Sequence, residues 1–599
     1  MCGIAGIIES QLSRDALEAR LQRLQTDLHH RGPDDAGMYV SGDARAGLVN
    51  TRLAIQDLSP AGNQPMHSAD GRYHIVFNGE IYNVAELRSE LQQEGVRFAS
   101  ECDTEVVLKL FERYGADSVR ELSGMFAVAI WDDLEKALFL ARGPLGIKPL
   151  YYCTRDEQLA FASEIRALLN TGLGQWRLSQ EAVSEYLLFG AVQEPGTLID
   201  GVRTLPAGHY LIARGGSVRV TKFWDVTFGN RRVTQAEAAR TVREALANSV
   251  ERHLVSDVPV GLFLSGGIDS TAILALASKR GITDLRTFSI SFDDPRFNEG
   301  DVAARTAAHF GTRHTDWRLD SRTAKSLLEQ FVLRSDQPSI DGFNTFCVSK
   351  LAHDEGLKVV LSGLGGDEVF GGYDSFRTIP KMVRASRLMT PLSPVRSGAG
   401  RLLERAKGTS QRFRRLGRFM ADVPITSTAY WAMRGIFTPS EVLRLLPRYG
   451  LKGLANPAVA LHVPPQPTLE DEVSYLELTR YMRNQLLRDS DVMSMAWGLE
   501  LRVPFVDSRL IEAVQNIPAE LRLAGKQLLL EAVPEIPEWV RNRPKQGFAF
   551  PFKEWVTGEW NDVFRQIEEE TPVRLGSWYR CWCVFALDRF VERHGLAAG

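Results

Sequence analysis

The sequence predicts an α/β chain of several domains, in which an α+β part precedes a parallel α/β part that ends in a helical extension. The chain has 599 residues, more than one hydrophobic core usually supports. Short apolar runs separated by turn residues fill it to about residue 210, and strand and helix patterns then alternate to about residue 380. We therefore predict domains at 1–210 and 236–599, joined by a linker at 211–235, with mostly helices after about 380.

In the first domain the apolar runs predict strands, and two segments have helical spacing. The strands are expected near 46–50, 73–80, 125–133, 137–143 and 159–164. The helices are expected at 15–28 and 103–114.

The second domain begins with a helix at 234–254 and an apolar strand at 258–264. The glycine-rich turn SGGIDS then opens a second helix, and the next strands are expected at 285–292 and 358–363, with a helix at 302–310 between them. This alternation predicts a parallel sheet that binds its ligand at the carboxyl ends of the strands. The basic stretch 396–419 is interpreted as a solvated helix face or a loop.

Composition excludes several classes of protein. A net charge of -3 lacks the basic excess that nucleic-acid binding needs. The six cysteines are scattered, which indicates reduced thiols and a cytoplasmic location. The first residues lack the basic region of a signal peptide, and no apolar run is long enough to span a membrane. We expect neither export, nor membrane contact, nor a nucleic-acid partner.

The opening MCGIAGI suggests a nucleophile at Cys2. Removal of the methionine would leave Cys2 with a free α-amine, whose ordinary pKa of about 7.7 to 8.0 allows it to accept the thiol proton. The alternative interpretation is a small buried residue that starts a strand.

The motifs HHRGPDDAG, NTRLAIQDLSPAGNQPM, VFNGEIYN and SECDTEVVL follow in order. Together with MCGIAGI they resemble the class II glutamine amidotransferases, which have an N-terminal nucleophile and a glutaminase fold of the α+β sandwich type. The resemblance implies that Asn78 and the N–H of Gly79 stabilise the oxyanion formed at Cys2. It implies glutamine contacts from Arg52, Ile55, Asn78, Gly79, Glu80 and Asp103. The family commonly has aspartate where this chain has Gly143, which affects a local support rather than the activity.

SGGIDS, LSGLGGDEVFGGY, MRNQLLRDSDVMSMAWGLELRVPFVD and RPKQGFAFP resemble the ATP-pyrophosphatase domain of asparagine synthetases, so the similarity covers nearly the whole chain. The resemblance implies that ATP is bound by Leu264, Ser265, Gly266, Gly267, Asp269, Ser270, Ile290, Ser362 and Gly363. It implies that Mg²⁺ is held by Asp269 and Asp367, because carboxylates suit a hard cation. Lys526 would stabilise charge on the leaving phosphates.

Two departures concern the acceptor substrate. Asparagine synthetases commonly carry an acidic residue where this chain has Leu364, and leucine cannot act as a base, so the base of the amidation step stays open. Many relatives have arginine at Leu530. In the nearby DQPSIDG, Asp336 or Asp341 would shape the acceptor pocket, or would cap a loop.

The resemblance implies one reaction from small-molecule substrates. Glutamine is hydrolysed at Cys2, a carboxylate is adenylated by MgATP, and channelled ammonia converts the adenylate to an amide and AMP. L-Aspartate is the first candidate acceptor; a peptide, sugar acid or secondary-metabolite precursor is the second. A catalytically inactive nucleotide-binding regulator is a third hypothesis, which the intact motifs oppose. The family is compatible with a homodimer, and no motif specifies one or shows whether the two sites are coupled.

Overall fold

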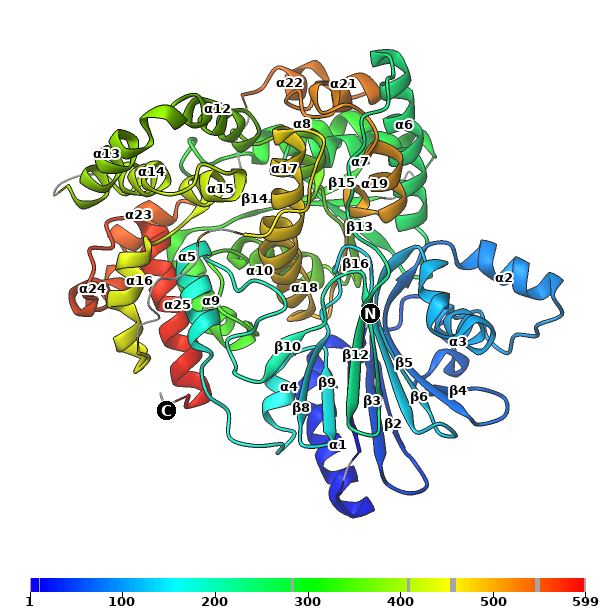
Figure 1. Cartoon of the computed structure of the whole chain (residues 1–599). Helices are drawn as coiled ribbons and strands as arrows, with labels where there is room; N and C mark the ends of the chain where they lie inside the picture. The colour runs from blue at the N-terminus through cyan, green and yellow to red at the C-terminus, as the bar shows by residue number, and fades with distance from the viewer. Residues whose placement is uncertain are drawn as a thin grey trace.

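The computed structural model describes residues 2–9, 11–281, 285–406, 410–452, 459, 461–544 and 550–596. Its first part is a sandwich of two antiparallel sheets (Figure 1). One sheet has the order β10 (Val202–Thr204), β8 (Tyr151–Arg155), β9 (Gln158–Ala162), β1 (Cys2–Ile8), β3 (Ala46–Arg52) and β2 (Asp35–Val40). The other has the order β12 (Ser217–Lys222), β11 (His209–Arg214), β7 (Ala137–Arg142), β6 (Gly124–Asp132), β5 (Tyr73–Ile81) and β4 (Met66–His67). Strand β12 lies within the range that the sequence assigns to a linker.

Alternation of side chains places an apolar face of each sheet inside the sandwich. Cys2 and Ile4 of β1 pack there with Val76 of β5 and Trp131 of β6. The outer faces are covered by α1 (Arg14–Leu28) on the first sheet and by α2 (Val84–Gln93) and α3 (Asp103–Tyr114) on the second. The result is the predicted α+β sandwich, and the predicted helices 15–28 and 103–114 are confirmed to within one residue.

The second part contains a parallel five-stranded sheet. Its order is β15 (Arg313–Arg318), β14 (Arg286–Ser291), β13 (Val260–Phe263), β16 (Val359–Leu361) and β17 (Glu500–Arg502). The chain runs outward from β13 in one direction and then returns to add β16 on its other side. The boundary between β13 and β16 is therefore a topological switch point, where open α/β sheets bind ligands at the carboxyl ends of the strands.

Helices cover the parallel sheet and form the extension. Those nearest to the sheet are α6 (Gln235–His253), α7 (Ile268–Lys279), α8 (Gly300–Phe310), α9 (Ser321–Arg334), α10 (Phe343–Asp354), α11 (Gly366–Phe370), α18 (Arg488–Met495) and α19 (Ser508–Val514). The helices α20 (Ala519–Arg522), α21 (Gln527–Ala532) and α22 (Glu538–Arg541) also lie on this part, beside α6 and α7 (Figure 1). The helical extension is formed by α12 (Ser375–Leu388), α13 (Ser393–Arg405), α14 (Gln411–Ala421), α15 (Thr426–Arg434), α16 (Pro439–Leu445), α17 (Leu469–Leu476), a π-helix at Glu477–Leu487, α23 (Phe552–Thr557), α24 (Asn561–Glu570) and α25 (Trp578–His594). Among the described residues, each helix is too short or too polar to cross a membrane.

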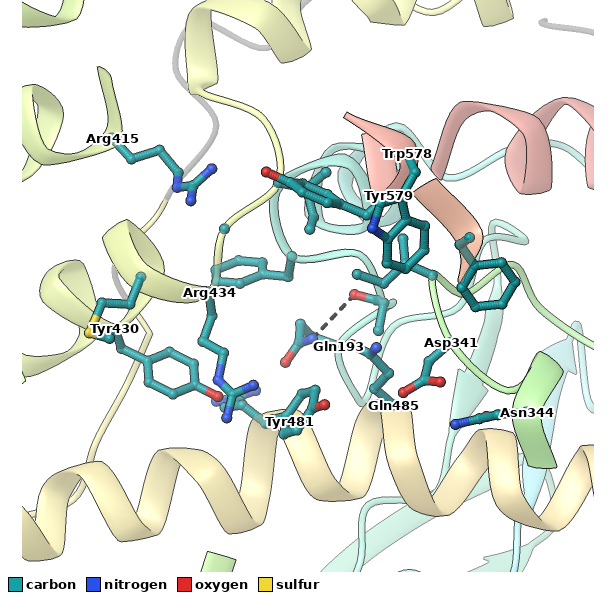
Figure 2. A pocket seen from close by; sticks show the side chains of 18 of the residues that line it. Gln193, Asp341, Asn344, Arg415, Tyr430, Arg434, Tyr481, Gln485, Trp578 and Tyr579 are labelled. Carbon is teal, nitrogen blue, oxygen red and sulfur yellow. Dashed lines mark hydrogen bonds between the residues drawn. The ribbon is translucent and has the colours of Figure 1, made fainter. Parts of the chain in front are cut away.

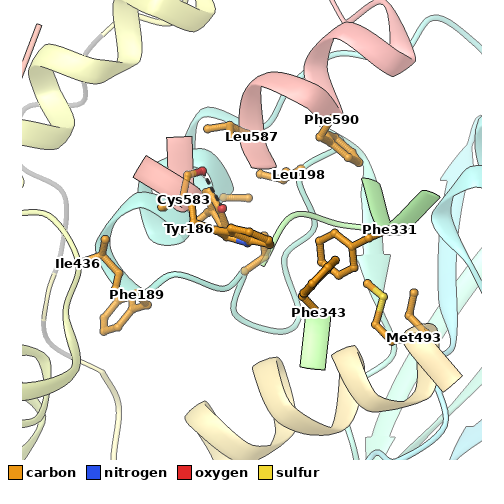
Figure 3. Packing of buried hydrophobic residues seen from close by; sticks show 14 of the residues in the cluster. Tyr186, Phe189, Leu198, Phe331, Phe343, Ile436, Met493, Cys583, Leu587 and Phe590 are labelled. Atoms are coloured by element: carbon orange, nitrogen blue, oxygen red, sulfur yellow. Dashed lines mark hydrogen bonds between the residues drawn. The ribbon is translucent and has the colours of Figure 1, made fainter. Parts of the chain in front are cut away.

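The largest hydrophobic core joins the two parts of the chain. Tyr186 of α5 (Gln180–Phe189) lies near Phe331 of α9, while Phe189 lies beside Ile436, and Phe590 of α25 (Trp578–His594) belongs to the same cluster (Figure 3). The hydroxyl of Tyr186 donates a hydrogen bond to the carbonyl of Cys583, 2.9 Å away. Because this core includes side chains from both parts, the parts cannot separate without exposing apolar surface.

Candidate active sites

The sandwich holds Cys2 at the first position of β1, an inner strand of its sheet. The side chain is buried, and Cys2 pairs in register with Arg52 of β3. The backbone nitrogen of Cys2 donates a hydrogen bond to Oδ1 of Asn78, 3.1 Å away. This nitrogen would be the α-amine after methionine removal, so Asn78 is placed to orient it.

The side-chain Nδ2 of Asn78 is available to donate a hydrogen bond to a ligand. Its side chain is fully buried on β5, and because Oδ1 accepts from Cys2, Nδ2 must face another group. Among the described residues, Nδ2 has no hydrogen-bond partner. An unpaired buried donor costs about 1–3 kcal/mol, and such a donor is the group that an oxyanion requires. The adjacent Gly79 has no room for a Cβ, which would collide with the carbonyl of Met125.

The loop that follows β3 surrounds the guanidinium of Arg52. Arg52 donates to the carbonyls of Ser59, at 3.2 Å, and Gln56, at 3.3 Å, and to Oδ1 of Asn63, at 2.8 Å. Ile55, in the same loop, is buried against Val359 and Met495 of the second part of the chain.

Glu80 and Asp103, the predicted ammonium-binding pair, are both buried. Oδ2 of Asp103 accepts the backbone N–H of Ile81 at 3.2 Å, and a carboxylate oxygen of Glu80 accepts from the side chain of Gln56. Burial raises the pKa of both carboxyl groups. A substrate ammonium group would lower these pKa values again by pairing with the charged forms.

A buried ionic network, which the sequence analysis did not predict, connects this site to the second part of the chain. Arg31 donates through Nε to the carbonyl of Cys2 at 3.3 Å, through Nη1 to Glu164 at 3.0 Å, and through Nη2 to Asp491 of α18 at 2.7 Å. Nζ of Lys148 lies 3.1 Å from the other oxygen of Asp491. Arg31 and Asp491 occur in the motifs HHRGPDDAG and RDSDVM, but nothing in those motifs indicates that the two side chains meet.

The second site is a cavity of about 580 Å³ at the carboxyl ends of β13 and β16. Every residue of the predicted ATP site lines it, together with the predicted metal ligands and the catalytic lysine: Leu264, Ser265, Gly266, Gly267, Asp269, Ser270, Ile290, Ser362, Gly363, Asp367 and Lys526. The loops that carry most of them follow the two strands at the switch point, which explains why segments about 100 residues apart in sequence share one cavity.

Lys526 contacts both predicted metal ligands, Asp269 and Asp367, through its ammonium group. Its backbone has φ 68°, a left-handed conformation that costs energy for a side chain with a Cβ and is concentrated at functional sites. Gly366 and Gly372 leave no room for a Cβ beside the two carboxylates. The sequence therefore maintains a close convergence of two carboxylates and one lysine.

This donor set fits MgATP. The two carboxylates come from different loops and converge on one cationic centre, Lys526 Nζ, inside the cavity. A divalent cation bound by few carboxylates and completed by phosphate oxygens is the usual form of Mg²⁺ in nucleotide enzymes.

The departures noted in the sequence fall in different environments. Leu364 lines the cavity, whereas Leu530 is absent from the cavity lining and packs against the core of the second part. Gly143 accepts the N–H groups of Gly146 and Gly208 through its carbonyl, both at 3.1 Å, so it supports a tight turn. These contacts place the Gly143 departure in a local turn.

The two candidate acceptor residues, Asp336 and Asp341, lie in different environments. Asp336 accepts the backbone N–H groups of Ile165, at 2.9 Å, and Arg166, at 3.1 Å, so it caps α4 (Ile165–Leu169) of the first part. Asp341 lines the cavity and accepts only the N–H of Gly342 among the described residues, at 2.8 Å. The geometry therefore favours Asp341 over Asp336 as an acceptor-site residue.

A sandwich with a buried cysteine at the start of an inner strand, joined to a parallel sheet with a glycine-rich phosphate loop, defines a glutamine-dependent amidotransferase with an ATP-using synthetase domain. Residues 1–224 match the glutamine amidotransferase domain family, and residues 241–594 match the asparagine synthase family. The chain belongs to the asparagine synthase family, and it is a carbon–nitrogen ligase with glutamine as the amido donor.

Curated relatives align along nearly the whole chain. Asparagine synthetase (glutamine-hydrolyzing) 1 of Bacillus subtilis (strain 168) is 34% identical, over 95% of this chain and 90% of the relative. A putative asparagine synthetase (glutamine-hydrolyzing) of Mycobacterium tuberculosis (strain ATCC 25618 / H37Rv) is 32% identical, over 93% and 88%. The protein named amidase chry2 of Gibberella zeae is 29% identical, over 93% and 90%.

Proposed function

We propose that this enzyme hydrolyses glutamine at Cys2 and transfers the ammonia to a carboxylate that it has activated with ATP. The carboxylate oxygen attacks the α-phosphorus of ATP, the bond to the β-phosphate breaks, and pyrophosphate leaves. Ammonia then attacks the acyl adenylate, which gives an amide and AMP. The observation that carries the proposal is the buried link from Cys2 through Arg31 to Asp491, because it joins the nucleophile strand to the domain with the ATP cavity.

In the glutaminase half, the Cys2 thiolate would attack the glutamine amide and form a thioester, which water would hydrolyse to glutamate. The unpartnered Nδ2 of Asn78 and the N–H of Gly79 would receive the developing negative charge. Arg52 would pair with the substrate carboxylate, while Glu80 and Asp103 would hold its ammonium group. Ile55 would contribute an apolar contact.

In the synthetase half, the SGGIDS loop and the start of α7 would cradle the phosphates of ATP. Leu264, Ile290 and Gly363 would contact the adenosine, and Ser362 lines the same cavity. Asp269 and Asp367 would hold Mg²⁺, which would supply charge neutralisation on the pyrophosphate. Lys526 would then bind the leaving phosphates. Its ammonium group would exchange its contacts with Asp269 and Asp367 for contacts with the phosphates.

Apolar contacts between the halves support direct passage of ammonia. Ile55 of the glutaminase half packs with Val359 and Met495 of the synthetase half, and Ile147 lies in one apolar cluster with Leu501. Ammonia released into water is mostly protonated and no longer nucleophilic, so walls of this kind would preserve its reactivity.

The names of two of these relatives point to L-aspartate as the acceptor, with asparagine as the product. A second candidate is a different carboxylate, and Leu364 favours it because this cavity-lining residue cannot accept a proton from ammonia. The intact cluster of Lys526 with two carboxylates opposes an inactive regulator. We keep as predictions the domain limits at 210 and 236, a cytoplasmic location and a homodimer.

The proposal is tested by incubating the enzyme with glutamine, MgATP and L-aspartate and measuring glutamate, AMP, pyrophosphate and asparagine by mass spectrometry. Cys2→Ala should lose glutamate formation, and added ammonia should restore its synthetase activity. Glutamate without AMP would exclude aspartate and leave the glutaminase assignment intact. Absence of glutamate in the wild-type enzyme, with its methionine removed, would exclude the proposed function.

A further inference from the structure

A second cavity of about 500 Å³ adjoins the ATP cavity. Three residues, Asp341, Asn344 and Tyr481, line both cavities, so the two spaces meet at these side chains. Pockets of about 300–1,000 Å³ are the size that holds drug-sized ligands. A substrate bound in the second cavity would thus extend into the ATP cavity.

The π-helix Glu477–Leu487 forms one wall of the second cavity. Tyr481 and Gln485 project from it into the space, whereas Leu486 faces the ATP cavity (Figure 2). Gln485 lines the cavity and is only 5% exposed. π-Helical turns are rare and occur frequently at functional sites.

Aromatic rings form the opposite wall. Figure 2 shows Trp578 and Tyr579 across the cavity from the π-helix. Trp578 stacks on Phe552 with ring centroids 4.9 Å apart and an interplanar angle of 27°, and Phe550 also lines the space. Surfaces of this kind bind planar or broadly apolar groups.

Within the described part of the chain, two guanidinium groups in the cavity form no ion pair with a carboxylate; among acidic groups, Arg415 has only a hydrogen bond to Tyr579 and the more distant charge of Glu441. Arg415 is only 7% exposed; its Nε donates to the carbonyl of Ala432 at 3.0 Å, and its Nη1 has no partner among the described residues. Arg480 also has an unpartnered Nε. By contrast, Arg434 in the same cavity is paired with Glu477, with Nη2 2.8 Å from Oε2. A buried cation without a counter-ion is costly, and a bound anion would remove this cost.

The polar groups of the cavity are separated along its length. Figure 2 shows Arg415 at one end and Asp341 with Asn344 at the other, where the cavity meets the ATP site. Asp341 is partly buried at the junction of the two cavities, and it would accept hydrogen bonds from an amino or hydroxyl group beside the reacting carboxyl. A molecule that met both ends would have to span the aromatic middle.

We propose that the second cavity is the acceptor site, and that the acceptor is a carboxylic acid with an aromatic or broad apolar body and a second anionic group that binds Arg415. This inference rests on the proposed function, because the reacting carboxyl must reach ATP. In L-aspartate only two carbon atoms separate the two carboxyl groups, so it cannot fill the aromatic middle and reach Arg415 while its reacting carboxyl lies at the ATP site.

The test uses the full-length enzyme with three probe acids: biphenyl-4,4′-dicarboxylate, biphenyl-4-carboxylate and L-aspartate. Binding of each acid is measured by calorimetry in the presence of a non-hydrolysable ATP analogue, and pyrophosphate release is measured with MgATP. Arg415→Met keeps the apolar stem of the side chain and removes its charge. Arg418→Met is the matched control, because Arg418 lies on the same helix, α14, but pairs with Asp422 at 2.8 Å outside the cavity.

We expect the dicarboxylate to bind at least tenfold more tightly than the monocarboxylate, and to release pyrophosphate. Arg415→Met should remove that difference, Arg418→Met should keep it, and Trp578→Ala should weaken both aromatic acids. Glutamine hydrolysis without acceptor should be unchanged in all variants, which also reports that they are folded.

The outcomes separate the two proposals. If L-aspartate releases pyrophosphate with a KM that is unchanged by Arg415→Met and Trp578→Ala, the acceptor inference is overturned and the proposed function stands. The inference is also overturned if the aromatic acids bind all variants equally. If the dicarboxylate binds through Arg415 while no acid yields pyrophosphate, the adenylation step of the proposed function is overturned.

Discussion

Glu80 of the glutaminase half and Arg502 of the synthetase half form a buried ion pair, with Oε2 and Nη2 3.1 Å apart. Arg502 is fully buried at the end of β17; it also contacts Glu500 and donates to the carbonyl of His253 at 2.8 Å. The carboxylate expected to hold the ammonium group of glutamine is thus positioned by a strand of the ATP-binding sheet. A structural change at either site can therefore act on the other site through this ion pair.

Arg502→Lys should raise the KM for glutamine by on the order of tenfold, with a smaller change in kcat. Lysine keeps the charge but loses the planar fork that serves Glu80 and Glu500 together, so Glu80 would be positioned less firmly. The measurement is steady-state glutamate release. Arg252→Lys, which alters only the nearby pair with Asp507, is the control. An equal rise in both variants would contradict a specific role for Arg502.

Asn78→Ala should lower kcat for glutamine hydrolysis by roughly 100-fold to 1,000-fold, because it removes one oxyanion donor. The thioester intermediate would form more slowly, and the KM should change little. Asn83→Ala provides the comparison: its buried amide bonds Glu121 and Ser123, so its loss should reduce stability and spare kcat. Similar kcat values for Asn78→Ala and the wild type would refute the assignment.

Lys526→Met should abolish ATP-dependent pyrophosphate release and leave glutamine hydrolysis intact. The ammonium group that contacts Asp269 and Asp367 would be lost, so the two carboxylates would repel one another in the absence of Mg²⁺. We therefore also expect Mg²⁺ alone to raise the melting temperature of Lys526→Met more than that of the wild type. Retained pyrophosphate release would remove Lys526 from the mechanism.

Because His253 is buried as a neutral ring against Tyr82, the enzyme should be less stable in mild acid. The rings lie 4.0 Å apart between the two halves, and burial lowers the pKa of His253 to about 4, against the influence of Asp507, while Arg502 and Arg252 lower it further. The unfolded chain takes up the proton near pH 6.5 and the folded chain does not. This contribution to stability is therefore complete above about pH 6.5 and is lost as the pH falls toward 4.

At pH 5 the loss from this group should be about 2 kcal/mol relative to pH 7. His253→Phe keeps a ring against Tyr82 and removes the titration, so its denaturation midpoint should change less between the two pH values. His29→Gln, at an exposed position, should follow the wild type. If His253→Phe lost as much stability as the wild type, other groups would account for the pH dependence.

Local patterns were sufficient to predict the elements that carry the two sites. Helix α3 follows directly from its apolar spacing, and the strand and glycine-rich turn at 258–270 from their composition. The residues of the predicted ATP site converge because each loop follows a parallel strand, and this rule needs no knowledge of side-chain packing.

Features that depend on distant contacts were not predicted. The basic stretch 396–419 was interpreted as a solvated face or a loop. Arg401 and Arg412 are exposed on the helices α13 and α14, as that interpretation expects. Arg396 and Arg415 are instead buried: Arg396 donates to the carbonyl of Asp422 at the end of α14, and Arg415 to that of Ala432 on α15. Residues 407–409 of this stretch lie outside the described residues. No residue type or pattern distinguishes the sequence of the π-helix from that of an α-helix. The pairing of Glu80 with Arg502 joins residues on separate domains.

The bond from Arg31 to Asp491 spans 460 residues of sequence. At the usual rate of synthesis, about 5–20 residues per second, Asp491 is made roughly 25 to 90 s after Arg31. Once Lys222 has been made the sandwich has all of its own strands, but the arginine that braces Cys2 still lacks its distant counter-ion. The strand that carries Cys2 therefore reaches its final environment late in synthesis. We expect an incomplete, ribosome-bound chain to hydrolyse glutamine slowly.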